Sequence, residues 1–113
     1  MISSELLGGN ADVVNAYVFA DATGGTPVIN KAFNVSSITD NGVGIFILNF
    51  TRAVASTNYT VAAASENAAG GTVPSIVYED GSTARTTTTY PMMVANSNNN
   101  RQDNKFSVVI LGA

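Results

Sequence analysis

Turn-forming residues interrupt this chain at short and regular intervals, and this spacing limits the folds that the sequence can adopt. Clusters of Gly, Pro, Asn and Asp recur about every 8 to 12 residues, and β-branched and aromatic residues fill the segments between them. No segment keeps a 3.6-residue apolar period for three turns, and the nearest candidate, residues 4–14, is broken by Gly8 and Gly9. The sequence therefore predicts an all-β fold, either an antiparallel β-sandwich or a small barrel of about seven to eight short strands.

The same pattern places the strands and their turns. Asp40, Asn41 and Gly42 give the strongest turn signal, because Asn and Gly tolerate the positive φ of a tight hairpin turn. Proline cannot donate to a β-ladder, so Pro74 suggests a sheet edge and Pro91 an edge or a bulge. The predicted strands are residues 16–20, 28–37, 45–50, 59–64, 72–78, 85–94 and 106–111, with a polar hairpin loop at 96–104. The segment 28–37 is either one strand with an irregularity near residues 31–32 or two short strands.

Composition restricts the chemistry that this chain of 113 residues, the size of one domain, can perform. Cys, His and Trp are absent, which removes thiol nucleophiles, imidazole bases and the commonest soft metal ligands. Charged residues make up only 12%, about half the usual share, and polarity comes instead from 13 Asn, 12 Thr and 10 Ser. We therefore expect no enzyme activity, no bound metal and no cofactor.

Charge and hydropathy argue against two further classes of partner. The net charge is −3, and the five Lys and Arg residues are spread singly along the chain, so the sequence has no basic patch for nucleic acid. The apolar runs are far shorter than the roughly 20 residues that a membrane-spanning helix needs. We expect neither nucleic acid binding nor membrane insertion.

The sequence divides into an expected N-terminal arm, residues 1–15, and a single β-domain, residues 16–113. The arm lacks the basic start of a signal peptide and carries five large aliphatic residues around Gly8 and Gly9. Such a segment is either a disordered leader or an arm that adds to a neighbour's sheet or docks on a larger particle. Both alternatives remain open at this point.

Residues 45–50 (IFILNF) present large apolar side chains to both faces of the predicted strand. In a soluble protein, either the domain covers both faces itself, or one face meets another subunit. We predict the second arrangement, with an oligomer interface that comprises Ile45, Phe46, Ile47 and Leu48.

Three segments in the first half of the chain together resemble a block that is common in bacteriophage tail fibres. They are residues 32–44 (AFNVSSITDNGVG), 48–51 (LNFT) and 57–61 (TNYTV), and the match is close over roughly residues 16–64. The resemblance implies an all-β knob or fibre module of a virion structural protein, usually a homotrimer, at or near the surface that meets the host. It implies no enzyme.

The shared residues of this block resemble a fold signature rather than an active site. By resemblance, Phe33, Val35 and Ile38 would occupy core positions, and Asn41-Gly42 would form the hairpin turn. Many members of the family have a polar residue and Tyr after the Gly-x-Gly turn, whereas this chain has an apolar pair at 45–46, which favours a covered second face. A chain this short would be a knob bound to another virion protein, a minor tail component or a protein that decorates the capsid.

Aromatic, amide and guanidinium groups in the second half of the chain could form a recognition surface for carbohydrate or a receptor. The alternative is that the aromatic residues pack at a sheet edge and that the Asn-rich loop, residues 96–103, only confers solubility. The candidate ligand-binding residues are Tyr78, Arg85, Tyr90, Asn98 and Arg101.

Glu79 and Asp80 are the only adjacent pair among the eight carboxylates. Glycosidase chemistry needs two carboxyl groups that flank a bound sugar. The sequence Glu79-Asp80-Gly81-Ser82 is also typical of an ordinary solvated turn, in which Asp and Gly serve the backbone. We predict the turn, with no catalytic or metal-binding role.

These observations predict a non-enzymatic bacteriophage virion structural protein, a trimeric β-domain attached to the particle as a tail-fibre knob or capsid decoration. Its expected partners are further copies of itself and other virion proteins, which residues 1–15 could contact. The alternative is a lectin-like module that binds glycan on the host surface.

Overall fold

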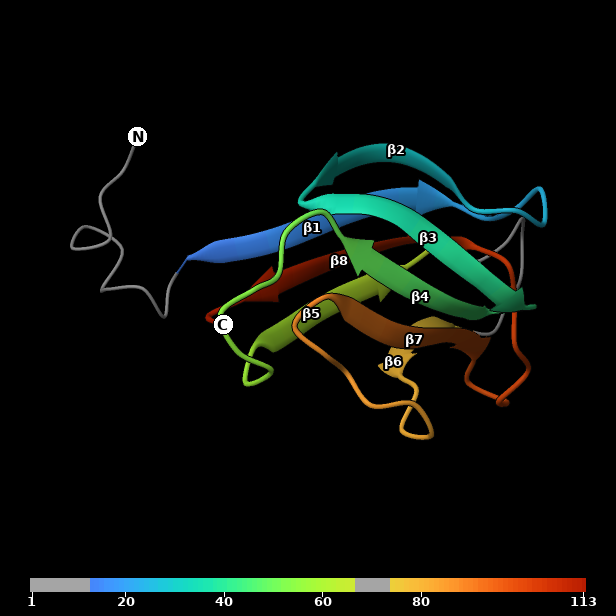
Figure 1. The fold of residues 1–113 in the computed structure, drawn as a ribbon. Coiled ribbons are helices and arrows are strands. Elements are labelled where there is room, and N and C mark those ends of the chain that lie inside the picture. Colours follow the sequence, from blue (N-terminus) through green and yellow to red (C-terminus); the bar gives the residue numbers. More distant parts are fainter. Residues whose placement is uncertain (1–12, 67–73) are drawn as a thin grey trace.

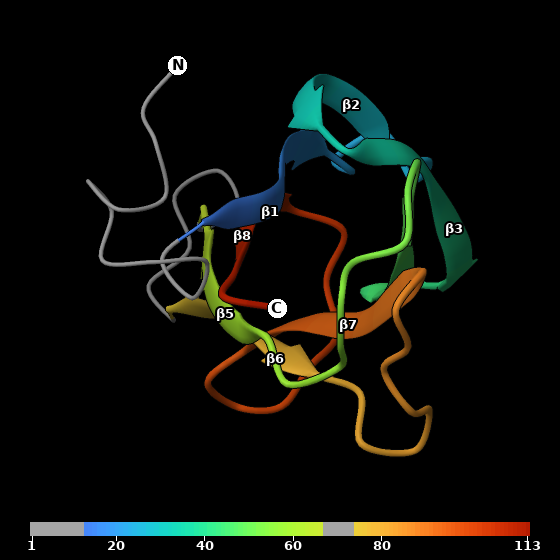
Figure 2. The same cartoon turned by 60° about the vertical axis from the view of Figure 1, so that its left-hand side comes forward.

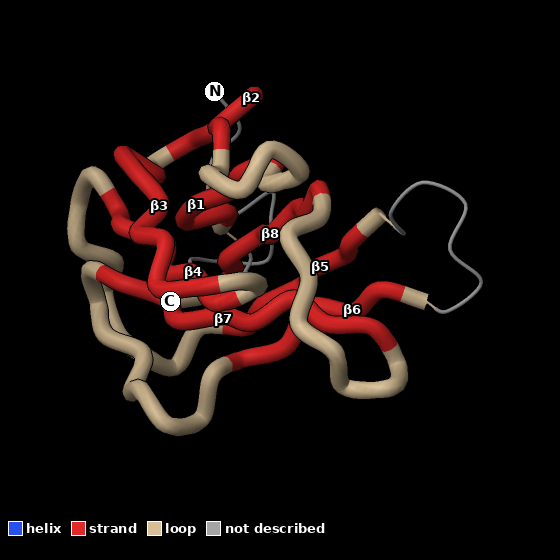
Figure 3. Tube along the Cα trace, turned by 90° about the vertical axis from the view of Figure 1, so that its right-hand side faces the viewer, coloured by secondary structure: helices blue, strands red, loops and turns tan. Residues whose placement is uncertain are grey.

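The computed structural model describes residues 13–66 and 74–113, which form eight β-strands (Figure 1). Most strand positions hold β-branched, aromatic or other apolar residues, and Gly, Pro, Asn or Asp stand in the turns. Figure 3 shows only strands and loops, and the described part of the chain contains no helix that could cross a membrane. The strands are β1 (Val14–Asp21), β2 (Val28–Phe33), β3 (Val35–Gly42), β4 (Ile45–Phe50), β5 (Thr60–Ser65), β6 (Ser75–Glu79), β7 (Thr89–Asn96) and β8 (Lys105–Leu111).

The strands form two four-stranded antiparallel sheets. Sheet A has the order β2-β1-β8-β5, and sheet B has the order β3-β4-β7-β6. Figure 2 shows β2 beside β3 on one side and β5 beside β6 on the other, so the sheets approach each other at both margins. The prediction of an all-β fold with the architecture of an antiparallel sandwich is confirmed.

The core lies between the sheets and is formed by alternate residues of the strands. In β4, Phe46 and Leu48 are each 1% exposed, whereas Ile45 and Ile47 point outwards and are partly exposed. The rings of Phe46 in sheet B and Phe106 in sheet A stack across the core, with their centroids 5.3 Å apart. The domain therefore covers one face of β4 by itself.

The irregularity predicted in residues 28–37 is a change of sheet. β2 belongs to sheet A and β3 to sheet B, and Asn34 between them has a φ of 57°. Asn is one of the few residues besides glycine that adopt this left-handed conformation at low cost. The alternative of two short strands is thus confirmed, with the break at Asn34, and β2 also has an irregularity between Ile29 and Lys31, where its pairing with β1 shifts register.

Phe33 does not occupy the core position that the tail-fibre resemblance implied. It is 50% exposed, and its ring stacks on that of Tyr17 with centroids 5.8 Å apart. Phe33 and Tyr17 are paired in register across β1 and β2, so both lie on the outer face of sheet A. Val35 is buried and Ile38 packs against the core, as expected.

β3 and β4 form the predicted hairpin, but its tip is at Val43 and Gly44 instead of at Asn41-Gly42. Gly44 has a φ of 66°, and a Cβ at this position would collide with the carbonyl oxygen of Val94. The N–H of Gly44 donates to Oδ1 of Asp103 at 2.9 Å. Glycine at position 44 therefore allows the hairpin tip to lie directly against β7 and the loop that follows it.

Pro91 lies in an inner strand, so the prediction of an edge or a bulge at this residue is wrong. It is opposite Ile47 of β4, and β6 lies on the other side of β7. The carbonyl oxygen of Pro91 accepts a hydrogen bond from the N–H of Asp80 at 3.2 Å. Because the nitrogen and the carbonyl group of a residue in an antiparallel strand face the same neighbour, the nitrogen of Pro91, which carries no hydrogen, also faces the β6 side. Because β6 ends at Glu79, the ladder is not interrupted by the missing N–H. Pro74 precedes β6, which is a sheet edge as predicted.

Two strands begin three or more residues later than predicted. β6 starts at Ser75, and the first residues of the predicted strand 72–78 lie outside the described part of the chain. β7 starts at Thr89, because the hydroxyl of Thr86 accepts hydrogen bonds from the N–H groups of Thr88 and Thr89 at 3.1 and 2.9 Å. These local bonds form a turn where extended backbone was predicted.

The β-domain begins earlier than the predicted boundary. β1 starts at Val14, and the N–H of Ala113 donates to Oδ1 of Asn15 at 2.9 Å. Residues 14–15 therefore belong to the sandwich. The predicted arm otherwise consists of residues 1–12, which lie outside the described part of the chain, and Val13.

Candidate functional site

The residues predicted as a ligand site come from different parts of the structure. Arg85 and Tyr90 belong to a cluster where β5 begins, β6 ends and β7 begins, and Tyr78 lies on the outer face of β6. Asn98 and Arg101 are exposed in the loop after β7. Tyr90 is 3% exposed, so the prediction that its ring contacts a ligand is wrong. The structure does not bring all five residues together, although Arg101, which is paired with Ala95 of β7, lies on the same outer side of sheet B as Tyr78.

Arg85 holds several strand ends together through its guanidinium group. It pairs with the carboxylate of Glu79, through Nε at 3.2 Å and through Nη2. Its Nη1 donates to the carbonyl oxygens of Tyr59 at 2.5 Å and Thr57 at 3.2 Å. The Cζ atom lies 4.4 Å from the centre of the Tyr59 ring and 5.7 Å from that of Tyr90. These internal partners favour a structural role for Arg85.

Burial changes the acid strength of the two tyrosines around Arg85. Removal from water raises the pKa of Tyr59, and it raises the pKa of Tyr90 to about 12. Hydrogen bonding to Glu79 raises the pKa of Arg85 above its already high usual value. At neutral pH the cluster therefore contains one guanidinium cation that faces two neutral phenol rings.

Glu79 and Asp80 have different partners. Oδ1 of Asp80 accepts hydrogen bonds from the N–H and the hydroxyl of Ser82, at 3.0 and 2.6 Å, and these bonds lower the pKa of Asp80. The turn predicted for Asp80 is confirmed. Glu79 instead forms the ion pair with Arg85, so the two neighbouring carboxylates do not face a common ligand.

An apolar strip crosses the outer face of sheet B. Ile45, Met93 and Tyr78 are paired in register across β4, β7 and β6 and therefore lie in one row. Ile47 lies two residues after Ile45 in β4, and Ile76 lies two residues before Tyr78 in β6, so both side chains are on the same face as this row. Ile76 is 46% exposed, and the other four are partly exposed. We call these five residues the sheet B strip.

The sheet B strip includes only part of the predicted oligomer interface. Ile45 and Ile47 point outwards, but Phe46 and Leu48 are each 1% exposed within the core. The prediction is therefore wrong for Phe46 and Leu48, because successive residues of a strand point to opposite faces. The sequence also did not indicate that β6 and β7 contribute to this face. Only the order of strands in sheet B shows that β7 lies beside β4 and that β6 lies beside β7.

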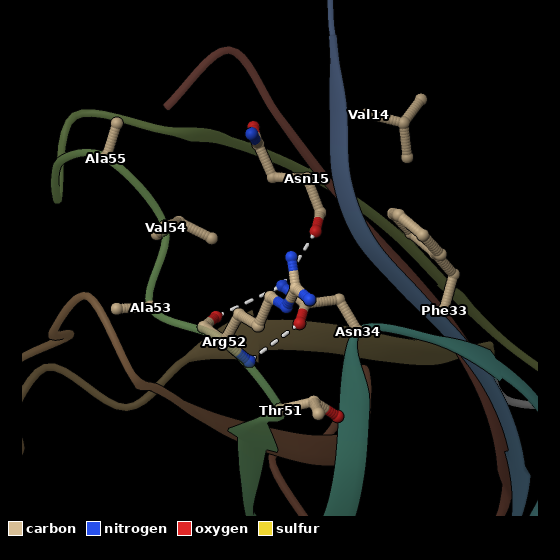
Figure 4. A pocket seen from close by; sticks show the side chains of 9 residues that line it. All are labelled: Val14, Asn15, Phe33, Asn34, Thr51, Arg52, Ala53, Val54 and Ala55. Atoms are coloured by element: carbon tan, nitrogen blue, oxygen red, sulfur yellow. Dashed lines mark hydrogen bonds between the residues drawn. The ribbon is translucent and has the colours of Figure 1, made fainter. Parts of the chain in front are cut away.

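A pocket of about 480 Å³ opens where β1 begins and where β2 and β4 end (Figure 4). Nδ2 of Asn34 donates to the carbonyl oxygens of Asn15 at 3.0 Å and Arg52 at 3.2 Å. Oδ1 of Asn34 accepts a hydrogen bond from the N–H of Arg52 at 2.8 Å. In Figure 4, Val14 and Phe33 lie on one side of Asn34, and the segment after β4 lies on the other.

Sequence reasoning missed this pocket. Its lining comes from three segments that are far apart in the sequence, residues 14–15, 33–34 and 51–55. The one local signal was Asn34, an Asn between two strand-like segments in a place where the chain has no Gly or Pro. That signal indicates a change of chain direction, but it does not show which segments meet there.

The fold and its surfaces define a β-sandwich with an apolar strip on one sheet and a pocket at one end. No group of three or more acidic side chains among the described residues is placed to hold a metal ion. Comparisons with known protein families, with curated proteins and with solved structures found no match for this chain.

Proposed function

We propose that this chain is a non-enzymatic structural protein of a bacteriophage virion, a β-domain that assembles as a homotrimer on the particle as a tail-fibre knob or a capsid decoration. The observation that carries the proposal is the sheet B strip, which leaves apolar side chains of three neighbouring strands on the surface. The tail-fibre resemblance of residues 32–44, 48–51 and 57–61 supports the assignment to a virion.

The sheet B strip has the properties of a surface that another subunit covers. It joins aliphatic, thioether and aromatic side chains and contains no charged residue. Contiguous apolar surface on a soluble protein is typical of an interface. Its burial would contribute about 25 cal/mol per Å² of apolar surface, a substantial addition to a domain whose own stability is about 5–15 kcal/mol.

A polar border lies beside the sheet B strip. Ser37 and Asn49 are paired in register, as are Thr39 and Ile47, so these side chains share the outer face. Nδ2 of Asn49 donates to the hydroxyl oxygens of Ser37 at 3.1 Å and Thr39 at 2.9 Å. An apolar centre with a polar rim is the usual composition of a protein interface, which supports a contact centred on the strip.

The residues of the tail-fibre block have identifiable structural roles. Asn34 connects the two sheets, and Val35 is buried in the core. Oδ1 of Asp40 accepts a hydrogen bond from the N–H of Gly42 at 3.1 Å next to the hairpin tip. The guanidinium group of Arg85 packs on the ring of Tyr59. These roles support the interpretation that the block specifies a fold, as expected for a structural module.

The solution mass of the full chain tests the proposal. Size-exclusion chromatography with light scattering should give about three times the chain mass of 11.6 kDa. A mass of one chain at every protein concentration would contradict the trimer. Incubation of the same sample with bacterial cells tests the lectin-like alternative, because retention of the protein on cells that a free glycan reverses would favour an adhesion module.

A further inference from the structure

We propose that the pocket around Asn34 binds a small organic carboxylate with an apolar body. The inference goes beyond the proposed function, because it depends neither on assembly nor on a particle. Two features of the pocket carry it: a guanidinium group that has no partner among the residues the structure describes, and an apolar wall that is open to solvent. A volume of about 480 Å³ lies within the usual range for small-molecule sites.

The cation of the pocket is Arg52. Its backbone N–H and carbonyl oxygen are both held by the side-chain amide of Asn34, at 2.8 and 3.2 Å, which fixes the base of the side chain. Within residues 13–66 and 74–113, the guanidinium group forms no ion pair and no hydrogen bond with another protein group. Arg85, in contrast, has Glu79 as its partner. The planar guanidinium group of Arg52, with its fork of donors, matches the two oxygens of a carboxylate.

The apolar wall of the pocket includes Val14 and Phe33, which are 41% and 50% exposed. Phe33 is supported from one side by Tyr17, whose ring centroid is 5.8 Å away. Val54 belongs to the segment after β4, is buried at 8% exposure and completes the lining. A ring or a short aliphatic body placed against this wall would remove these side chains from water.

The same geometry disfavours a ligand that is rich in hydroxyl groups. Asn34, the central amide of the pocket, uses both its oxygen and its nitrogen in bonds to the backbone of Asn15 and Arg52. Oδ1 of Asn15 accepts the N–H of Ala113. Few polar groups therefore remain to pair with a neutral sugar, and the guanidinium group supplies most of the recognition.

The test is a titration of the full-length ¹⁵N-labelled chain followed by amide NMR shifts. The probes are phenylacetate, its uncharged isostere phenylacetamide, and acetate, which lacks the apolar body. Phenylacetate should cause saturable shifts around residues 14–15, 33–34 and 51–55, with a Kd of about 1 mM for a ligand of this size. The other two probes should bind about tenfold more weakly or not measurably.

Two substitutions separate the contributions of charge and wall. Arg52→Gln should weaken phenylacetate binding about tenfold, and Phe33→Ala should weaken phenylacetate binding but not alter the response to acetate. Arg101→Gln is the matched control, because Arg101 is an exposed arginine outside the pocket. The proposal is overturned if phenylacetate gives no saturable shifts there, if phenylacetamide binds equally well, or if Arg52→Gln and Arg101→Gln have the same effect. Each outcome is read from the pocket amides and is independent of whether the chain is a trimer.

Discussion

The Arg85 side chain combines an ion pair, two backbone hydrogen bonds and two ring contacts in one place. Glu79 and Arg85 are partly exposed, with 34% and 26% of their side chains accessible, so the ion pair alone contributes modestly. The neighbouring tyrosines are different, because they are 3% exposed and burial raises the pKa of both above the usual value. The response of this cluster to alkaline pH therefore comes from its phenols.

High pH should destabilise the folded chain through Tyr90. Its pKa is about 12 in the folded state and about 10 when unfolded, so between these values only the unfolded chain releases the proton. The contribution of Tyr90 to the free energy of unfolding is constant below pH 10. As the pH rises from 10 towards 12, the free energy of unfolding falls by up to about 2–3 kcal/mol. Tyr90→Phe removes the titrating group and should reduce the loss of stability between pH 9 and pH 11.5, measured by urea unfolding at each pH.

A matched control for this pH dependence is Tyr17→Phe, which alters an outward-facing tyrosine that stacks on Phe33. The pKa of Tyr59 is also raised by burial, so the Tyr90→Phe protein should still lose some stability at alkaline pH. If Tyr90→Phe and the wild type lose stability equally between these pH values, burial of Tyr90 does not control the alkaline response.

At the scale of elements, the junction between β2 and β3 decides how the two sheets are connected. Asn34 provides a φ of 57° and three hydrogen bonds that join β1 to the segment after β4. Asn34→Ala removes these bonds. It also places alanine, which has no polar side chain to stabilise it, in the left-handed conformation. We expect a loss of about 2–4 kcal/mol in the free energy of unfolding.

Asn34→Gly separates the two effects, because glycine accepts the left-handed conformation but also lacks the amide. It should be about 1 kcal/mol less destabilising than Asn34→Ala in urea unfolding at a fixed protein concentration. Equal destabilisation by both substitutions would show that backbone conformation makes no contribution. Wild-type stability in both would rule out the junction as a determinant of the fold.

Most elements of this fold could be predicted from the sequence, because turn residues and strand composition act locally. The predictions failed where a contact between distant segments overrides the local pattern. Pro91 is tolerated in an inner strand because β6 ends beside it, and Phe33 is exposed because Asn34 changes the sheet directly after it. Gly44 rather than Gly42 forms the hairpin tip, where it contacts the backbone of β7.

In the whole molecule, the two surfaces for which we propose a function depend on the order of strands in the sheets. Strand β4 could be recognised as apolar on both faces, but the partners of Ile45 and Ile47 come from β7 and β6. The pocket likewise depends on the junction at Asn34, which brings the segment of Arg52 to the start of β1. Composition and periodicity do not specify these long-range neighbours.

We propose that the sheet B strip assembles the chain into a trimer. Ile76→Lys places a charge in the strip at a residue that is 46% exposed, so it should disrupt assembly without damage to the core. Val28→Lys is the matched control, because Val28 is 58% exposed on β2 in the other sheet. Light scattering at one protein concentration is the measurement: we expect a monomer for Ile76→Lys and a trimer for Val28→Lys, with both proteins folded. A trimer for Ile76→Lys would contradict assembly through the sheet B strip.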